Sequence, residues 1–336
     1  MLRRRRHRPS RRGLEGNVTV YSRPVTHWTP RLLSGRFDAI LQANRANLEQ
    51  AREELGAFDL IHAHAAFPAG LLARQLAAGI PYVVTEHSGR ALRARVARSG
   101  VGRRALTEGL SGAAAVIAVS HALARQLAQA GPGASDVIPN VIDEEFFTRA
   151  DVPRPTERPR VFSLARLVDG KGVVELLEAT AHLRAAGLPV DLRIGGDGPR
   201  RKEWEDYARR LGLEKDVSFL GILPRESVRE ELWNCSCFAL ASEAESFSVV
   251  CIEALACGRP VVATRSGGPE DIVTEENGVL VPARDVEALA AGLRSVLARD
   301  FDAEAIRSDA VRRFGSEAVA TALEAVYRRV TAGRAD

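Results

Sequence analysis

The sequence predicts an α/β protein with two domains, each built around a parallel β-sheet covered by helices on both faces. Short apolar runs alternate with longer segments of helical spacing from about residue 58 onward, which is typical of parallel strands joined by crossover helices. The runs are almost continuously apolar, as expected for strands buried on both faces. Residues 149–160, rich in proline and charge, separate two such series and indicate a linker. The fold class is therefore two Rossmann-like domains.

The candidate strands follow one another along the chain in two series. The first series contains FDLIHAH, PYVVTEH, AAVIAVS and DVIPN, and the helical segments between them end at glycine. The second series contains RVFSLAR, PVDLRIGG, DVSFLG, CFALAS, PVVAT and GVLVPA. We expect an N-terminal domain over residues 17–150 and a C-terminal domain over residues 160–312, with residues 1–16 as a basic disordered tail.

The charge of the chain is concentrated at its N-terminus. The formal net charge is +4, but residues 1–12 carry seven arginines, and without them it is 4 − 7 = −3. Such a tail could make peripheral contact with an anionic membrane or with nucleic acid, but a disordered leader or a wrongly chosen start codon is the favoured interpretation. Because the basic character belongs to a tail and the body is mildly acidic, we expect no nucleic-acid partner.

The sequence favours a cytoplasmic protein without a metal. No apolar run reaches the roughly 20 residues of a membrane span, and no secretory signal is present. The four cysteines fall in one short region with no histidine cluster to complete a metal site, and a reducing compartment fits them. The Asp300-Phe301-Asp302 segment follows a helical pattern and is predicted to be a helix boundary rather than a metal site.

Charged and glycine-rich segments follow the strands of the second series. Arg166 lies just past the first strand, Lys171 begins the next helix, and Gly195–Gly198 follow the second strand. The SEAESFS segment after the fourth strand leads into a helix near Ser248, whose N-terminus suits an anion. Each segment alone is also consistent with a turn or a solvated surface. Together, at the carboxyl ends of one sheet, they predict a glycine-lined cationic rim for a diphosphate.

One carboxylate is placed inside an apolar helix pattern. Glu253 lies among Val249 to Ala256, and seven residues separate it from Glu245. A charge in such surroundings costs free energy unless a polar group meets it. A backbone amide or a bound ligand would meet that need.

With these segments the chain resembles the retaining glycosyltransferases of family four, which have the GT-B fold of two Rossmann-like domains facing across a cleft. In the second domain the resemblance is carried by SLARLVDGKG, IGGDGPRR, FLGILPRESV, ESFSVVCIEALACGRPVVATRSGGPEDIV and NGVLVPARDVEALA. In the first domain it is carried by DLIHAHAAFPAG, VVTEHSG, AVSHALARQL and VIPNVIDEEFF. The pair Glu245 and Glu253 matches the family's motif at both positions.

The resemblance implies roles for the matching residues. Glu245 contacts hydroxyls of the donor sugar, and Glu253 accepts two charge-assisted hydrogen bonds from the ribose of the nucleotide. Arg166 and Lys171 correspond to the cationic pair that stabilises the departing diphosphate, which makes a metal unnecessary. His87 matches a cleft histidine that faces the acceptor or the donor sugar. Loop residues complete the donor site: Gly196, Asp197, Gly198, Ser246, Phe247 and Ser248.

Three further histidines lie in the first domain. His62 and His64 alternate along one strand, and we expect them to face opposite sides of the sheet, one of them in the core. His121 follows Ser120, which looks like a helix N-cap, so we expect His121 to be structural.

The two ends of the chain carry further expectations. The family's opening strand and glycine-rich loop have no counterpart before NVTVY, so we expect an incomplete first domain with an exposed sheet edge or an apolar groove. Near the C-terminus, apolar residues recur at helical spacing after Ser316, a predicted N-cap. The resemblance implies that this helix, over residues 315–333, returns to the first domain.

The sequence thus predicts a retaining, metal-independent glycosyltransferase of the hexosyltransferase type. It would move a sugar from a nucleotide-diphosphate donor, most often a UDP-sugar in the family, to a hydroxyl of a glycan or glycolipid acceptor in polysaccharide biosynthesis. No cofactor is expected beside this co-substrate. The alternatives are an inactive nucleotide-sugar-binding paralogue and a GT-B epimerase or phosphorylase.

Overall fold

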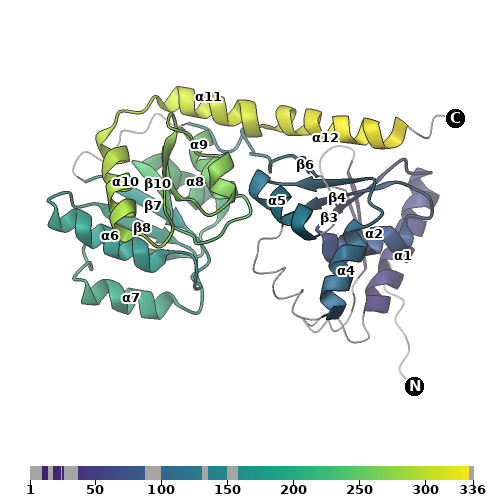
Figure 1. Ribbon diagram of the computed structural model, residues 1–336, viewed down its shortest axis with the longest axis horizontal. Helices are drawn as coiled ribbons and strands as arrows, with labels where there is room; N and C mark the ends of the chain where they lie inside the picture. Colours follow the sequence, from purple (N-terminus) through teal and green to yellow (C-terminus); the bar gives the residue numbers. More distant parts are fainter. Residues whose placement is uncertain are drawn as a thin grey trace, which may run out of the picture. The chain divides into compact units, whose positions relative to one another are not determined.

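A computed structural model describes residues 10–13, 18–23, 25, 37–87, 100–130, 135–149 and 158–332. The chain divides into two compact units (Figure 1). The first unit comprises the chain up to Ile117, Ala130–Asp136 and the segment from Val326 onward, and the second comprises Ala118–Gln129 and Val137–Ala325. Most of the predicted linker lies outside the described residues, so the predicted domain bounds stay a prediction.

The second unit is built on a six-stranded parallel sheet with the order β12-β11-β10-β7-β8-β9. From β7 the chain adds two strands on one side and then crosses to add three on the other. The order therefore reverses between β7 and β10, and ligands of such sheets bind at the carboxyl ends of the strands beside this reversal. The strands are β7 (Arg160–Leu164), β8 (Asp191–Gly195), β9 (Val217–Gly221), β10 (Cys237–Leu240), β11 (Val261–Thr264) and β12 (Gly278–Val281).

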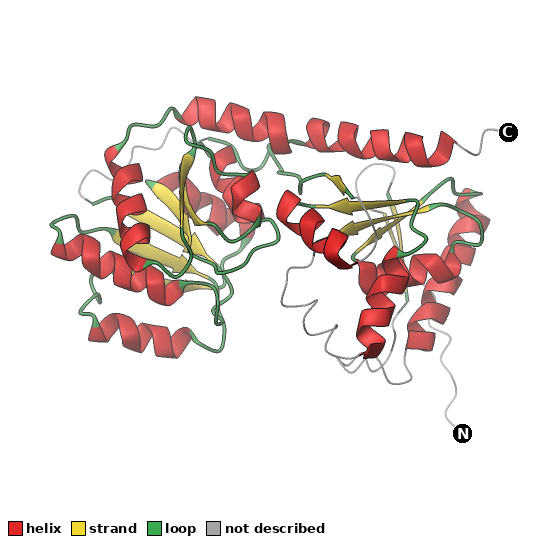
Figure 2. Ribbon diagram, viewed as in Figure 1, coloured by secondary structure: helices red, strands yellow, loops and turns green. Residues whose placement is uncertain are grey.

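Helices cover both faces of this sheet (Figure 2). Helix α6 packs against α10, and α9 packs against α11. All residues of β10 and β11 are buried between the two layers, as their apolar sequences predict. The helices are α6 (Val173–Ala185), α7 (Arg201–Arg210), α8 (Arg225–Asn234), α9 (Val249–Ala256), α10 (Val286–Ala298) and α11 (Ala303–Phe314), with a 3-10 turn η2 (Gly268–Asp271).

The predicted helix boundary at Asp300-Phe301-Asp302 is confirmed. Helix α10 ends at Ala298, and α11 begins at Ala303. The carboxylate of Asp302 accepts hydrogen bonds from the backbone N–H groups of Glu304 and Ala305, at 2.9 and 3.0 Å. Asp302 is therefore the N-cap of α11.

The first unit contains most of a four-stranded sheet with the order β3-β4-β5-β6. Among the described residues β3 is an edge strand, and a cavity of about 450 Å³ lies beside it. Its walls combine apolar residues, Leu48 of α1, Ile61 of β3 and Leu72 of α2, with polar ones such as Asn44 and Asn47. The expected exposed edge or apolar groove stays a prediction. The elements are α1 (Phe37–Leu55), β3 (Ile61–His64), the π-helical turn η1 (Ala66–Gly70), α2 (Leu71–Leu76), β4 (Tyr82–Glu86), α4 (Gly100–Leu110), β5 (Ala115–Ala118), α5 (His121–Ala130) and β6 (Asp136–Val137).

One part of the predicted disordered tail is paired instead. Strand β1 (Ser10–Gly13) runs antiparallel to β2 (Thr19–Ser22). Backbone pairing does not depend on apolar side chains, so an arginine-rich segment can join a two-stranded ladder. Residues 1–9 and 14–16 of the predicted tail lie outside the described residues.

The C-terminal helix α12 spans Ser316–Thr331. Val319 and Val326 of its predicted apolar face are buried. The helix up to Ala325 belongs to the second unit, and from Val326 onward to the first. Ser316 is its first residue, and its hydroxyl donates to the Glu144 carboxylate at 2.5 Å, a partner that lies 172 residues away and that no local pattern could reveal.

Candidate functional site

The loop after β7 carries Arg166 and Lys171 and is fixed to the end of β10. The carbonyl of Gly170 accepts a hydrogen bond from the N–H of Glu243 at 2.9 Å. Gly172 has φ +68°, and a Cβ there would collide with the carbonyl of Ala241, so only glycine fits between the loop and the strand end. Arg166 is exposed and makes no hydrogen bond or ion pair from its side chain with a described residue.

Lys171 meets Glu245 beside the reversal of strand order. Nζ of Lys171 donates to Oε1 of Glu245 at 2.6 Å, with 28% and 17% of the two side chains exposed. The main chain of Glu245 is held on both sides, because its N–H donates to the Ser266 carbonyl and its own carbonyl accepts from Gly268 N–H, both at 2.9 Å. Loops after β7, β10 and β11 therefore meet at Glu245, where a sheet of this order binds its ligand.

The glycine-rich loop after β8 lies against the loop that carries Arg166. Gly196 has φ +111°, and a Cβ at this position would collide with the carbonyl of Ala165. A Cβ at Gly198 would collide with the carbonyl of Leu167, whose N–H donates to the Asp197 carbonyl at 3.0 Å. The glycines thus serve a contact between two protein loops. A ligand role for Gly196, Asp197 and Gly198 stays a prediction.

In the segment before α9, the side chains of Phe247 and Ser248 contact the protein itself. The ring of Phe247 is only 2% exposed and packs edge-to-face on Phe314, with 6.0 Å between ring centroids. Ser248 has φ +104°, and its hydroxyl lies 3.3 Å from Sγ of Cys251 instead of capping α9. Any ligand contact by Phe247 must therefore use its main chain, and the first N–H groups of α9 are not capped by Ser248.

Glu253 is a largely desolvated carboxyl group in the middle of α9. Burial raises its pKa to about 7, and the positive charge of Arg225 at the start of α8 acts in the opposite direction. Among the described residues, none donates a hydrogen bond to its side chain. A ligand hydroxyl that donated to it would favour the ionised form.

Sequence reasoning missed a second ion pair at this rim. Glu243, two residues before Glu245, pairs with Arg284, and this pairing lowers the pKa of the Glu243 carboxyl. Arg284 follows β12, so 41 residues separate the partners. Glu243 lies within the SEAESFS segment that the sequence analysis identified, but no local sequence pattern indicates its distant partner, Arg284.

The histidines of the first unit form a stacked row. The rings of His62 and His64 lie 4.5 Å apart, so the expectation that they face opposite sides of the sheet is wrong, because residues two apart on a strand share a face. Nδ1 of His64 lies 2.9 Å from Nε2 of His87. His62 lies between the hydroxyls of Tyr327 and Thr85, and burial, with the charges of His64 and His87, lowers its pKa to about 4.

The predicted N-cap before His121 is confirmed, and the structural role of His121 itself stays a prediction. Its backbone N–H donates to the Asp271 carboxylate at 2.6 Å. Ser120 Oγ accepts from the N–H of Leu123 at 3.0 Å, the hydrogen bond of an N-cap.

The cysteines are inert core residues. Cys235, Cys237, Cys251 and Cys257 are free and buried, and burial raises the pKa of each thiol. The described residues hold no group of three or more His, Cys, Asp or Glu side chains that could bind a metal ion. In the same part of the chain, every helix is too short or too polar to cross a bilayer.

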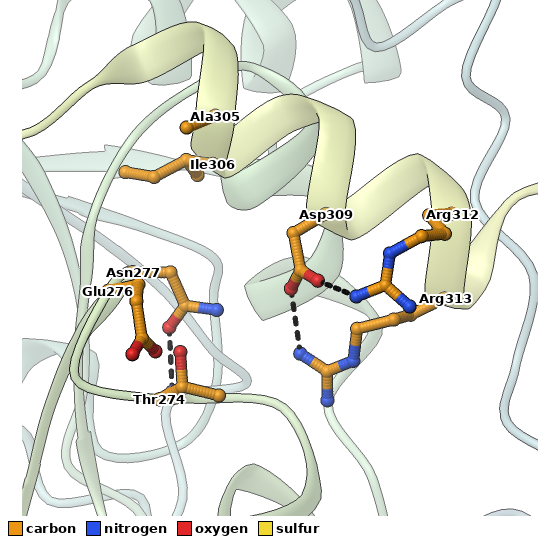
Figure 3. A pocket seen from close by; sticks show the side chains of 8 residues that line it. All are labelled: Thr274, Glu276, Asn277, Ala305, Ile306, Asp309, Arg312 and Arg313. Carbon is orange, nitrogen blue, oxygen red and sulfur yellow. Dashed lines mark hydrogen bonds and ion pairs between the residues drawn. The ribbon is translucent and has the colours of Figure 1, made fainter.

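A separate cavity of about 400 Å³ lies in the second unit, between the segment before β12 and helix α11 (Figure 3). Asp309 on its wall forms ion pairs with Arg312 and Arg313. None of the predicted donor-site residues lines it. Its lining residues are Thr274, Glu276, Asn277, Ala305, Ile306, Asp309, Arg312 and Arg313.

Comparison with known proteins places the chain among glycosyltransferases. A family model described as "Glycosyl transferases group 1" matches residues 144–313, and one described as "Glycosyltransferase Family 4" matches residues 2–146. YqgM of Bacillus subtilis, an uncharacterized glycosyltransferase, is 30% identical over 73% of this chain and 69% of its own length. TuaC of the same organism, a putative teichuronic acid biosynthesis glycosyltransferase, is 31% identical over 69% of this chain and 59% of its own length.

The structure of HepE from Anabaena, solved in complex with UDP, shares the fold. It superposes with a TM-score of 0.70 at 24% identity, covering 90% of this chain and 84% of HepE. The predicted fold class, α/β with two Rossmann-like domains of the GT-B type, is confirmed by this likeness and by the sheets of the two units. With a group 1 model matched over half of its length, the chain belongs to the glycosyl transferases of group 1.

Proposed function

We propose that the chain is a retaining glycosyltransferase that transfers a sugar from a nucleotide-diphosphate donor, a UDP-sugar, to a hydroxyl of a glycan or glycolipid acceptor. The observation that carries the proposal is the Lys171–Glu245 pair at the strand-order reversal. It brings a cation for the diphosphate and a carboxylate for sugar hydroxyls within 2.6 Å of each other.

Each residue has a task in this proposal. Arg166 and Lys171 hold positive charge where the leaving diphosphate becomes more negative, which stabilises the transition state more than the bound donor. Glu245 orients the sugar through its hydroxyls. Glu253, a desolvated carboxyl group without a hydrogen-bond donor among the described residues, takes the ribose hydroxyls.

The acceptor side of the proposal rests on the first unit. His87, held by its contact with His64, is proposed to face the acceptor hydroxyl or the donor sugar. A leaving phosphate oxygen takes the acceptor proton in this proposal, since no separate carboxylate nucleophile is assigned. The name of TuaC supports a polysaccharide acceptor, and the UDP complex of HepE supports a UDP-linked donor.

The test is incubation of the purified chain with UDP-, GDP- and ADP-linked sugars, with acceptor glycans and glycolipids in turn. Release of nucleoside diphosphate that depends on an acceptor, with the anomeric configuration of the donor kept in the product by proton NMR, is the expected result. Donor binding without turnover would instead identify a nucleotide-sugar-binding paralogue. Turnover without any acceptor would point to an epimerase.

A further inference from the structure

Lys171 and Glu245 form one composite ligand-binding group, and we propose that their pairing makes the site favour a diphosphate that still carries its sugar over a bare diphosphate. This inference rests on the proposed function. The two side chains are mostly shielded from water, with 28% and 17% exposed, and the ion pair joins them at 2.6 Å. Charges in such a place interact more strongly than charges on an open surface.

Neither partner can withdraw from the other by a movement of its backbone alone. The N–H and the carbonyl of Glu245 are both hydrogen-bonded to the loop after β11. The loop of Lys171 is held by the hydrogen bond from Glu243 N–H to Gly170 and by the close contact of Gly172 with Ala241. A ligand can therefore separate the two charged groups only by rotating their side chains.

The ion pair leaves hydrogen-bonding groups of both Lys171 and Glu245 available to a ligand. A lysine ammonium has three donors, and the described residues take one of them through Oε1 of Glu245. Oε2 of Glu245 receives no hydrogen bond from a described residue. A sugar diphosphate satisfies both partners, because its phosphate accepts from Lys171 and a sugar hydroxyl donates to Glu245.

A bare diphosphate satisfies only one partner. Its negative charge must compete with the Glu245 carboxylate for Lys171, and it brings no hydroxyl to offset the repulsion. Discrimination that includes a repulsive element of this kind lowers the affinity for the wrong ligand without strengthening the right one. Glu245 thus weakens the hold on the product once the sugar has left, which promotes product release.

The test is a calorimetric titration with inorganic pyrophosphate, which carries neither base nor sugar. Glu245→Gln should bind pyrophosphate about tenfold more tightly than the wild type, since it frees Lys171 at unchanged shape. Glu243→Gln is the matched control: it makes the same charge change two residues away, but Glu243 pairs with Arg284. Its affinity should stay within about twofold of the wild type. In a Lys171→Met background, Glu245→Gln should also change the affinity by less than about twofold.

Three results would overturn the inference: an equal gain in the two glutamine variants, a full gain in the Lys171→Met background, or no measurable binding by wild type and Glu245→Gln alike. Thermal unfolding of each variant checks that the fold is kept. The titration needs no turnover, so it is separate from the proposed function. If the pyrophosphate affinities change as expected but the protein transfers no sugar, only the proposed function is refuted. If the protein transfers sugar but Glu245→Gln does not change the pyrophosphate affinity, only this inference is refuted.

Discussion

The hydroxyl of Tyr327 lies 2.6 Å from Nδ1 of His62, so the end of α12 is hydrogen-bonded to strand β3 within the first unit. Burial raises the pKa of Tyr327, so the hydroxyl remains protonated at neutral pH and can donate to the imidazole. Nε2 of His62 meets the hydroxyl of Thr85 at 2.7 Å, which occupies the second ring nitrogen. The neutral imidazole is thus satisfied on both sides.

Tyr327→Phe should therefore lower the free energy of unfolding of the first unit by about 1 kcal/mol, because it leaves a half-buried ring nitrogen without its partner. Urea unfolding followed by circular dichroism measures the change. Tyr21→Phe is the control, since the Tyr21 hydroxyl bonds Glu54 at an exposed position and should matter less. An equal loss in the two variants would contradict the special role of Tyr327.

The same site predicts a pH dependence of stability. The pKa of His62 is about 4 in the folded protein against an ordinary value of 6.5. Between these values the unfolded chain binds a proton at His62 that the folded chain does not, so the free energy of unfolding should fall as pH falls from 6.5 to 4. Urea midpoints of wild type and His62→Asn across this window measure the effect, with the exposed His182→Asn as control. Parallel profiles for wild type and His62→Asn would contradict it.

The raised pKa of Glu253 predicts that donor binding releases a proton. Ribose hydroxyls that donate to the carboxylate favour its ionised form, so affinity for UDP should rise with pH and level off above about 7. If only the ionised form binds, UDP should bind about tenfold more weakly at pH 6 than at pH 8. The reference is calorimetry on Glu253→Gln, which lacks the Glu253 carboxylate, so that only the phosphate groups of UDP still titrate in this pH range. Identical slopes for the two proteins would remove Glu253 from the ribose site.

Arg166→Ala and Lys171→Ala should each lower kcat by about 10²–10³ and change donor KM less, because their charge matters most as the diphosphate leaves. Steady-state release of nucleoside diphosphate gives both constants. Arg209→Ala is the control, since exposed Arg209 pairs with Asp206 of the same helix, α7. A raised KM at unchanged kcat would remove the leaving-group role.

Turnover should persist in excess EDTA, because the proposed function assigns the leaving group to two cations, Arg166 and Lys171, in place of a metal. The measurement compares initial rates with and without chelator after dialysis. Loss of activity with EDTA, restored by added Mg²⁺, would contradict this account.

From about residue 58 onward the sequence predicted the regular elements well, because each of these strands and helices has a local cause. All ten expected strands of the two sheets are present, and Asp302 caps α11 through bonds to residues two and three positions ahead. The carboxyl-end loops of β7 and β10, which glycine and charge mark locally, were expected at one rim and do meet there. Their role in ligand binding stays a prediction.

What the sequence could not show are contacts between distant segments. Lys171 and Glu245 lie 74 residues apart, and only the strand order brings their loops together. The buried ring of Phe247 packs on Phe314, a contact made by α11. The close approach of the glycines after β8 to the carbonyls of Ala165 and Leu167 also depends on two distant segments. The error for His62 and His64 was of another kind, because the strand period itself places them on one face.

Donor binding at the strand-order reversal of the second unit can be tested by hydrogen exchange followed by mass spectrometry, with and without saturating UDP. The proposed donor site predicts slower exchange in the loops 165–172 and 243–248, which meet at the Lys171–Glu245 pair, and in the loop 195–198, which lies against the first of them. It predicts no change in residues 274–277 and 305–313, which line the separate cavity of Figure 3. Protection of that cavity, with the three loops unchanged, would contradict the account.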